Sequence, residues 1–399
     1  MAESPEVEVR PTTPGDAEAW LDLLEEVAAE GLWLGTEAPI DREARRSRFV
    51  AQLGSPSTGS FVAVDGDQLV GSLGAVMRAG MGAGVADLGM LVASGRRGQG
   101  VGSALMEACL AWAREVGAHK LALTVWPHNH AARALYAKFG FVTEGTLRRE
   151  VRRRNGELWD AIVMGLVLDT ASPGRPGGQA GTRPAGAGRG GGARAATGGE
   201  RPRLELPGGA LRRDGVLLRP GRLADAEALA AAIDDPEVHR WLDAVPDPYT
   251  VEDARRFLAG TRQGWVEGTA ANFLVLEEEG ARLAGGIGLT LDREDPGLGE
   301  VGYWLAARSR GRGLATTAVE AVARWALGPV GLRRLELRAA LGNRASRAVA
   351  ERAAFRPEGV LRSWRAVHGR PTDFALYSRL AAPAPGPSSG PCPAPGPGP

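Results

Sequence analysis

The chain has 399 residues, with 48 lysines and arginines against 47 aspartates and glutamates. The near-zero net charge argues against bulk nucleic-acid binding, and the two cysteines cannot form a disulfide framework. No apolar run reaches the length of a membrane span and the acidic N-terminus is unlike a signal peptide, so we expect a cytoplasmic protein with no membrane partner.

Hydrophobic periodicity in the first part of the chain predicts an α/β order of elements. An Asp-Gly-Asp turn between two apolar runs and an Asn-Gly pair near residue 155 predict hairpins. The predicted strands are 7–10, 61–64, 69–76, 85–92, 121–126, 141–152 and 159–168, and the predicted helices are 16–29, 42–53, a helix starting near 103, and 129–139.

A glycine-rich turn joins one predicted strand to the helix after it. Arg97, Gly98, Gly100 and Gly102 fall within six residues there. Glycines allow a sharp bend and a close approach of the backbone to a ligand, and the first turn of a helix offers unpaired N–H groups. The turn therefore suits a phosphate or pyrophosphate, and Arg97 adds a full charge. Ser103 stands where a dinucleotide fingerprint needs its last glycine, and no P-loop lysine follows.

The same turn occurs again at Arg310, between another predicted strand and helix. Other sequence features recur at similar distances from the two turns. An identical Asp-Ala-Glu-Ala begins at Asp16 and at Asp225, and Asn129 follows the first turn at nearly the distance at which Asn343 follows the second. This agreement indicates two homologous domains in tandem.

The second part of the chain is predicted to repeat the order of the first. Its matching strands are 216–219 and 301–305, and its matching helices are 225–233 and 316–327. A stretch rich in glycine, alanine, proline and arginine separates the two parts, and a proline-glycine stretch ends the chain, so both are predicted to be disordered. The predicted divisions are a first domain at 7–169, a linker at 170–212, a second domain at 214–381 and a tail at 382–399.

The repeated turn resembles motif A of the GNAT superfamily of acyl-CoA-dependent N-acetyltransferases. The resemblance implies two tandem α/β domains, each with a mixed central sheet flanked by helices, in which two neighbouring parallel strands splay apart. Acetyl-CoA would be the co-substrate, its pantetheine arm would lie in that gap, and no metal would be required. The acetyl group would pass directly to an amine without a covalent enzyme intermediate.

The resemblance also assigns residues to the cofactor. The last strand residues before each turn would pair with the pantetheine arm through their backbone, each turn would hold the pyrophosphate, and the asparagine after it would contact the arm. The residues assigned in this way are Leu91, Val92, Arg97, Gly98, Gln99, Gly100, Val101, Gly102, Asn129, Leu305, Arg310, Gly311, Arg312, Gly313, Leu314, Ala315 and Asn343.

The catalytic candidates of the first domain are a tyrosine and an aspartate. Tyr136 occupies the position after Asn129 where many relatives place a tyrosine that protonates the departing thiolate, a role that suits a phenol. Some relatives have a glutamate base on the strand before the asparagine, where this chain has Thr124. Asp87 is therefore the alternative base, acting through water, and a plain strand-end carboxylate is the competing interpretation.

The segment 236–249, the run 300–305 and the Asn343-x-x-Ser346 pair are similar to those of Rim-type transferases, which acetylate the N-termini of ribosomal proteins. This resemblance covers roughly 216–380. Ala350 replaces the tyrosine, so Ser346 or water would supply the proton. Glu300 aligns with Asp87 and is the base candidate, whereas Glu336 is expected to pair with Arg338 on its own strand.

Several questions stay open at this stage. Two alternatives remain for the domains: both transfer acetyl groups, or one transfers and the other only binds acyl-CoA. A protein N-terminus, a lysine, an aminoglycoside and a polyamine all remain as acceptors, nucleic acid is the less favoured partner, and the oligomeric state is undecided. The arginines at 148–154 are interpreted as a solvated edge rather than an acidic-substrate site. The histidines show no metal-ligand spacing.

Overall fold

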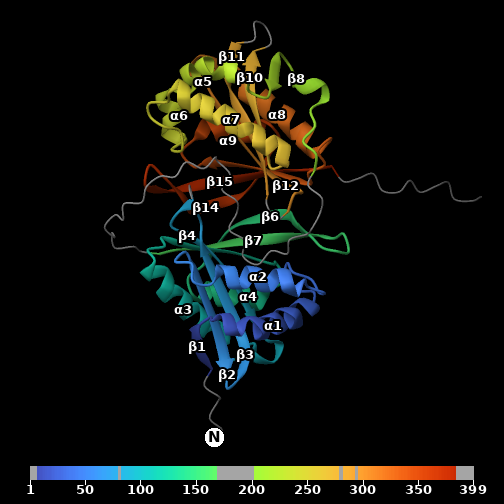
Figure 1. Ribbon diagram of the computed structural model, residues 1–399, viewed down its shortest axis with the longest axis vertical. Coiled ribbons are helices and arrows are strands. Elements are labelled where there is room, and N and C mark those ends of the chain that lie inside the picture. Colours follow the sequence, from blue (N-terminus) through green and yellow to red (C-terminus); the bar gives the residue numbers. More distant parts are fainter. Residues whose placement is uncertain (1–6, 80–81, 169–201, 278–281, 293–294, 383–399) are drawn as a thin grey trace, which may run out of the picture.

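The computed structural model describes residues 7–79, 82–168, 202–277, 282–292 and 295–382. We refer to 7–168 as the N-terminal half and to 202–382 as the C-terminal half. Both halves are α/β, with helices on the two faces of a mixed sheet, as predicted (Figure 1).

The elements of the N-terminal half match the predicted ranges to within a few residues. They are β1 (Glu8–Pro11), α1 (Ala17–Ala29), α2 (Arg42–Gln52), β2 (Thr58–Asp65), β3 (Gln68–Met77), β4 (Val85–Val92), α3 (Val101–Glu115), β5 (Lys120–Val125), α4 (His130–Lys138), β6 (Val142–Arg152) and β7 (Leu158–Val167).

The C-terminal half repeats this order and adds a strand at its start and a helix after α5. Its elements are β8 (Leu211–Arg213), β9 (Val216–Arg219), α5 (Ala226–Ile233), α6 (Pro236–Trp241), α7 (Val251–Glu267), β10 (Ala270–Glu277), β11 (Arg282–Leu291), β12 (Leu298–Leu305), α8 (Leu314–Leu327), β13 (Arg334–Ala340), α9 (Arg344–Arg352), β14 (Arg356–Val367) and β15 (Arg370–Leu380).

The two halves share one continuous sheet. Its strand order is β1-β2-β3-β4-β5-β7-β6-β14-β15-β13-β12-β11-β10-β9-β8, so the second half runs as the mirror order of the first. The halves join where β6 meets β14, antiparallel, with Gly145 opposite Gly359 (Figure 1). A Cβ on Gly359 would lie 2.0 Å from the carbonyl oxygen of Glu144, so this close approach requires glycine.

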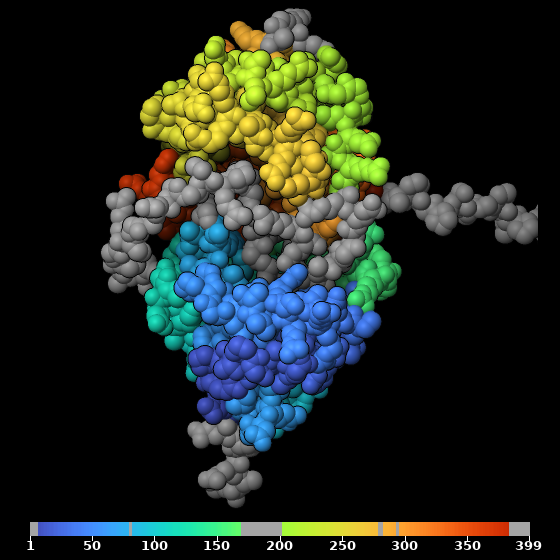
Figure 2. All heavy atoms as spheres, viewed as in Figure 1, coloured from blue at the N-terminus to red at the C-terminus, as the bar shows by residue number. Residues whose placement is uncertain are grey.

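Equivalent helices of the two halves cover the same face of the sheet. On one face, α3 packs Leu105 and Cys109 against the strands, and α8 does the same with Val319 and Val322. On the other face lie α1 and α2 in the N-terminal half and α5, α6 and α7 in the C-terminal half, which form much of the surface seen in Figure 2. The two halves are thus related by an approximate two-fold axis through the β6–β14 contact.

The repeated Asp-Ala-Glu-Ala has a structural cause. Arg10 donates to both carboxylate oxygens of Asp16, at 2.9 and 2.7 Å, and Arg219 donates to both oxygens of Asp225, at 2.8 and 2.7 Å. Each aspartate also accepts from a backbone N–H three residues earlier. The pair therefore fixes the corner between β1 and α1 in one half and between β9 and α5 in the other.

The predicted linker ends earlier than its boundary at 212. Residues 202–212 are described, and within them β8 pairs with β9 while Leu204, Leu206 and Leu211 pack against the core of the C-terminal half. The leucines that the glycine-rich stretch lacks begin at Leu204, which explains why burial becomes favourable there. The rest of the predicted linker and nearly all of the tail lie outside the described residues.

The interpretation of 148–154 as a solvated edge is wrong. Strand β6 is not an edge, because β14 pairs with it. Arg148 donates to Glu358 of the C-terminal half at 2.9 Å, and Arg153, only 3% exposed, donates to the carbonyl oxygens of Gly31 and Leu34. These arginines hold the loop between α1 and α2 and the junction of the two halves.

Candidate active site

Two parallel strands splay apart in each half. Strand β4 pairs with β5 only as far as Asp87 opposite Ala122, although both strands continue beyond that point. Strand β12 pairs with β13 only as far as Glu300 opposite Glu336. The backbone edges beyond these pairs have lost their partner strand and can pair with an extended ligand.

The predicted glycine turns lie at the end of the splayed strands. Gly98 and Gly100 have φ of 76° and 88°, and Gly311 and Gly313 have φ of 73° and 80°. Gly100 is the N-cap of α3 and Gly313 that of α8. The N–H groups at the start of both helices therefore have no partner inside their helix and are available to an anion.

The arginines of the turns are tied back to the protein. Arg97 donates from Nε to the carbonyl oxygen of Val92 at 3.2 Å and pairs with Glu30 through both terminal nitrogens, at 2.7 and 2.5 Å. Arg310 donates to the carbonyl oxygen of Leu305 at 3.0 Å and pairs with Asp235. Both arginines thus fasten the turn to the helical region that follows the first helix. Their predicted contact with pyrophosphate stays a prediction.

The remaining cofactor candidates are placed as follows. Asn129 Oδ1 accepts from the N–H of Ala132 at 3.1 Å, and Asn343 Oδ1 accepts from that of Ser346 at 3.0 Å, so both asparagines cap the helices α4 and α9. Gln99 donates to the carbonyl oxygen of Gly95 within its own turn. Leu91 belongs to the core under α1.

Tyr136 is buried beside the splay, on the α3 side of the sheet. Its side chain packs against Phe141, with ring centroids 5.8 Å apart, and against the cluster that contains Cys109. Burial raises the pKa of Tyr136 to about 12. The phenol is therefore protonated at neutral pH, as a proton donor must be.

Asp87 is not a plain strand-end carboxylate. Arg78 donates to it from Nε at 2.7 Å and from Nη2 at 2.5 Å, and both side chains are about nine-tenths buried. Thr124, at the position where some relatives have a glutamate, is exposed in the middle of a strand whose neighbours Leu123 and Val125 are buried. The face of the sheet opposite α3 is thus open at the splay.

The equivalent region of the C-terminal half carries charges instead. Arg338 occupies the position of Thr124 and pairs with both Glu300 and Glu336, the latter at 2.6 Å, which agrees with the pairing predicted for Glu336. The Glu300 side chain is 41% exposed, whereas that of Arg338 is 8% exposed. Gly302, two residues after Glu300, is exposed on the same central strand.

Sequence reasoning missed a hydroxyl pair in the C-terminal half. Tyr303 on β12 donates to Ser346 Oγ at 3.0 Å, on the face that packs against α8 and α9. Burial raises the pKa of Tyr303 to about 12, although the bond to Ser346 lowers it in part. An aromatic residue in an apolar strand predicts only core packing, so its sequence offered no signal of this bond.

Sequence reasoning also missed the buried charges of the junction. Lys120 and Arg334 occupy equivalent positions, the first residues of β5 and β13, and neither side chain is exposed. Lys120 pairs with Glu144 at 2.7 Å and donates to the carbonyl oxygen of Arg362 in the other half.

Arg334 makes the corresponding bonds on the other side of the axis. It pairs with Glu150, Glu336 and Glu358, and it donates to the carbonyl oxygen of Arg148 at 2.9 Å. Each half thus has a buried cationic side chain that donates to a backbone carbonyl of the other half.

One group of described side chains has metal-ligand types close together. Asp234, His239 and Asp247 each bring a ligand atom within 4.8 Å of the other two. His239 lies 3.0 Å from Asp234 and can donate to it, which accounts for their closeness without an ion.

A sheet that splays over a glycine turn and a helix N-terminus occurs in both halves, which is the arrangement that the resemblance to GNAT acetyltransferases implied. Two family models match this chain, "Acetyltransferase (GNAT) family" over 20–141 and "Acetyltransferase (GNAT) domain" over 216–356. The chain belongs to the GNAT acetyltransferases, and each half carries one family domain. This confirms the family and fold that the repeated turn predicted.

Individual relatives match less than half of the chain. "Uncharacterized N-acetyltransferase p20" of Bacillus licheniformis is 28% identical over 166 residues, which are 41% of this chain and 92% of that protein. "L-amino acid N-acetyltransferase AaaT" of Escherichia coli is 41% identical over 87 residues, 21% of this chain and 51% of that protein. The chain thus spans only about half the length of some curated relatives it matches.

Among solved structures, Mycobacterium smegmatis RimJ in complex with CoA-disulfide is 26% identical, with a TM-score of 0.40, and the match covers 43% of this chain and 86% of that one. "Putative ribosomal N-acetyltransferase YdaF" of Bacillus subtilis is 40% identical over 81 residues, which are 20% of this chain and 44% of that protein, so a ribosomal-protein acetyltransferase is among the proteins that this chain resembles, as predicted. None of the helices in the described ranges is long and apolar enough to cross a membrane.

Proposed function

We propose that each half binds acetyl-CoA at its splay and that the chain transfers the acetyl group directly to a primary amine. The observation that carries the proposal is the splay itself, which in both halves ends on a turn with two left-handed glycines and a helix N-terminus. The pyrophosphate would accept from the N–H groups of the turn, and the pantetheine arm would pair with the free edge of β4 or β12.

The amine approaches from the opposite face of the sheet, where Thr124 and Gly302 are exposed. Its lone pair attacks the thioester carbonyl, a C–N bond forms, and the tetrahedral intermediate expels the CoA thiolate. Asp87 or Glu300 would take up the amine proton through water. Tyr136 would protonate the thiolate in the N-terminal half.

In the C-terminal half, Ser346 takes the place of that tyrosine. Its hydroxyl would give the thiolate a proton and recover one from Tyr303, which already donates to it, and Tyr303 would then be reprotonated from water. The two halves would then release the same products, an N-acetylated amine and free CoA, through different proton donors. The acceptor class, whether a protein N-terminus, a lysine or a small amine, is the open part of the proposal.

One observation favours a second candidate, in which only the C-terminal half transfers and the N-terminal half senses acyl-CoA. Both oxygens of Asp87 are engaged by Arg78 and both side chains are buried, whereas Glu300 is 41% exposed. A buried carboxylate with both oxygens engaged is poorly placed to receive a proton through water, whereas an exposed carboxylate is reached by solvent.

Glycine variants test the proposal in each half. Gly100→Ala and Gly313→Ala put a Cβ into the proposed phosphate site at a left-handed φ, and Gly66→Ala and Gly215→Ala impose the same strain on distant hairpin turns, with φ of 59° and 76°. Calorimetric titration of the wild type with acetyl-CoA should show two sites. Each site variant should weaken one site about tenfold or more, and each control should keep both.

Turnover is then followed as CoA thiol release with four acceptors: a peptide with a free N-terminus, an Nα-blocked lysine, an aminoglycoside and a polyamine. Turnover that falls in both site variants supports two active halves. Turnover that falls only in Gly313→Ala supports the second candidate. No acetyl-CoA binding by the wild type would refute both.

A further inference from the structure

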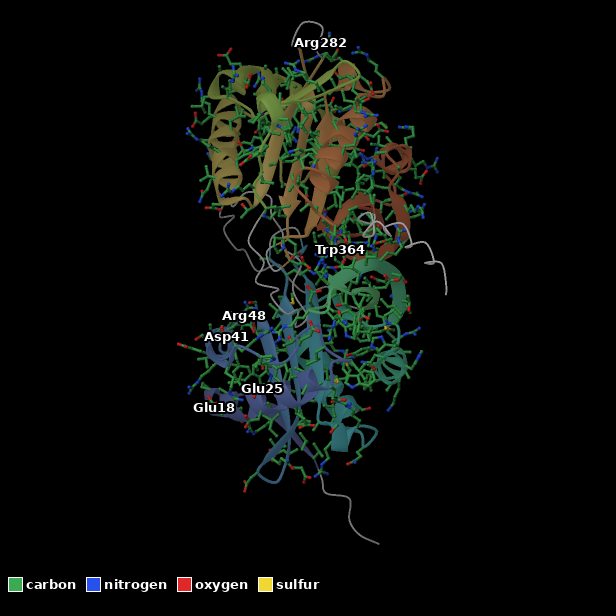
Figure 3. All side chains as sticks on the ribbon, turned by 90° about the vertical axis from the view of Figure 1, so that its right-hand side faces the viewer. Glu18, Glu25, Asp41, Arg48, Arg282 and Trp364 are labelled. Carbon is green, nitrogen blue, oxygen red and sulfur yellow. The ribbon has the colours of Figure 1, made fainter. Side chains whose placement is uncertain are left out.

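A bulge in β14 carries a tryptophan from the C-terminal half into the N-terminal half. The pairing of β14 with β15 shifts between Leu361 and Arg365, and Ser363 has a φ of 43°. The N–H of Ser363 donates to Asp373 at 2.8 Å, which fixes the bulge. Trp364 follows it and lies at the junction of the two halves (Figure 3).

The same bulge exists in β6, where it is followed by a different residue. The pairing of β6 with β7 shifts between Leu147 and Val151, Arg149 has a φ of 51°, and its N–H donates to Asp160 at 2.7 Å. Glu150 follows this bulge and pairs with Arg334 of the C-terminal half at 3.0 Å. The two bulges thus lie at equivalent positions, and the residue after each one contacts the other half. This residue is the carboxylate Glu150 in the N-terminal half and the indole Trp364 in the C-terminal half.

Trp364 packs on the face of the N-terminal half to which the amine comes. It packs against a cluster that contains Trp126, the residue after β5, and Val163 of β7, on the face opposite α3. Two backbone contacts hold its segment there: Lys120 donates to the carbonyl oxygen of Arg362, and His119 Nε2 lies 3.2 Å from that of Ser363.

The indole also contacts the cations that hold the two predicted bases. The Arg78 guanidinium, which is bidentate to Asp87, lies with its Cζ 3.8 Å from the Trp364 ring centroid. The Arg338 guanidinium, which pairs with Glu300, lies 5.2 Å from the same centroid. Both distances are within the range of cation–π attraction.

We propose that Trp364 is a positioning residue shared by both acceptor sites. Through Arg78 it fixes Asp87 beside the N-terminal splay, and through Arg338 it fixes Glu300 beside the C-terminal splay. The N-terminal acceptor site is therefore incomplete without the C-terminal half. The inference rests on the proposed function, because it concerns how the amine is received at those sites.

The test uses the full chain with one cofactor site disabled at a time. In the Gly313→Ala background the N-terminal site is measured, and in the Gly100→Ala background the C-terminal site. Into each we introduce Trp364→Leu, Trp364→Phe and Arg362→Ala. The arginine variant is the matched control, because its side chain crosses the same junction to Glu144 and to the carbonyl oxygen of Gly165 without supporting either carboxylate.

The readouts are kcat and KM for the most active amine of the four-acceptor panel, and the acetyl-CoA dissociation constant. Rates are measured at an acetyl-CoA concentration near the dissociation constant of the intact site, at which the weakened site stays mostly empty. We expect Trp364→Leu to lower kcat/KM for the amine about tenfold at the N-terminal site, and less at the C-terminal site where the ring is farther from its arginine. Trp364→Phe should restore most of the loss because it keeps an aromatic face. Acetyl-CoA affinity should stay within about twofold.

The proposal is overturned if Trp364→Leu behaves like Arg362→Ala, if phenylalanine does not restore activity, or if acetyl-CoA binding falls in parallel with amine turnover. Such results in an active wild-type chain would leave the proposed function intact. A wild type that turns over none of the four amines overturns both, and acetyl-CoA titration of the same samples shows whether cofactor binding survives.

Discussion

The two halves agree where a cofactor would bind and differ where an amine would. Both turns have two left-handed glycines, and both arginines bond the last carbonyl of the splayed strand. By contrast, the position facing the acceptor is an exposed Thr124 in one half and a buried, paired Arg338 in the other. A site built from backbone geometry tolerates divergence of the side chains around it, so the two halves can keep one co-substrate while accepting different amines.

Substitutions at the junction should have the largest effect on stability, and they test how alike the two halves are. Arg334→Met leaves three buried carboxylates without a shared cation, and Lys120→Met leaves only Glu144. We expect both to lower the free energy of unfolding, by about 5 and about 3 kcal/mol respectively, in urea titrations. Arg362→Ala, whose side chain is 39% exposed, should cost less than about 1 kcal/mol.

Equal losses of unfolding free energy from Lys120→Met and Arg334→Met would show that the two sides of the junction contribute equally to stability. A loss from Arg362→Ala as large as either would instead locate the stability at the rim of the junction.

The proton donors give the next largest effect. Tyr136→Phe should lower kcat of the N-terminal site about 100-fold. Among the described residues, no second hydroxyl is bonded to Tyr136 that could replace it as the proton donor. Tyr303→Phe should lower kcat of the C-terminal site only about tenfold, since Ser346 keeps its own proton. Burial raises the pKa of Tyr136 to about 12, so its site should show no alkaline loss from this group at ordinary assay pH.

Steady-state rates from pH 6 to pH 10 in the Gly313→Ala and Gly100→Ala backgrounds separate the two sites. A Tyr136→Phe variant as fast as its parent would assign the N-terminal proton donor to water. It would also remove the main chemical difference between the halves.

The arginine–aspartate pair before the first helix of each half allows the halves to be compared through the pH dependence of stability. Arg10 bonds Asp16 and lowers the pKa of that carboxyl to about 2, and Arg219 lowers the pKa of Asp225 in the same way. Because the folded pKa lies below the unfolded one, the stabilisation is complete above about pH 4 and is lost as the pH falls toward 2. Asp16→Asn should therefore cost about 2 kcal/mol at pH 6 and progressively less below pH 4.

Urea titrations of wild type, Asp16→Asn and Asp225→Asn at pH 3, 4 and 6 check this prediction. A difference between wild type and variant that does not change with pH would mean that the ionised pair contributes nothing beyond packing.

Much of the fold could be predicted from the sequence because its signals are local. The glycine turns, the capping asparagines and the alternating apolar runs each determine a few neighbouring residues, and their repetition gave the tandem arrangement. The ends of the splayed strands follow from the same local reasoning, because each turn marks where its strand stops.

The junction could not be predicted, because its contacts join residues far apart in sequence. Lys120 and Arg334 stand in strands where a charged residue normally predicts a solvent-facing position, and nothing near β6 indicates that β14 covers it. Glycines 145 and 359 are ordinary strand residues until the two strands meet. The contacts of Trp364 could not be predicted for the same reason, because its partners Arg78 and Lys120 belong to the other half.

The two predicted bases give the smallest effect and the most direct comparison of the halves. Glu300→Gln should lower kcat of the C-terminal site about tenfold and leave stability nearly unchanged, because Arg338 keeps Glu336 as a partner. Asp87→Asn should also lower kcat of the N-terminal site about tenfold, and it should lower stability as well, since it leaves the Arg78 guanidinium buried without its carboxylate. If Asp87→Asn instead lowers stability and leaves kcat of the N-terminal site unchanged, then the buried, paired carboxylate is not the base. In that case only the C-terminal half has a carboxylate base, as the second candidate function requires.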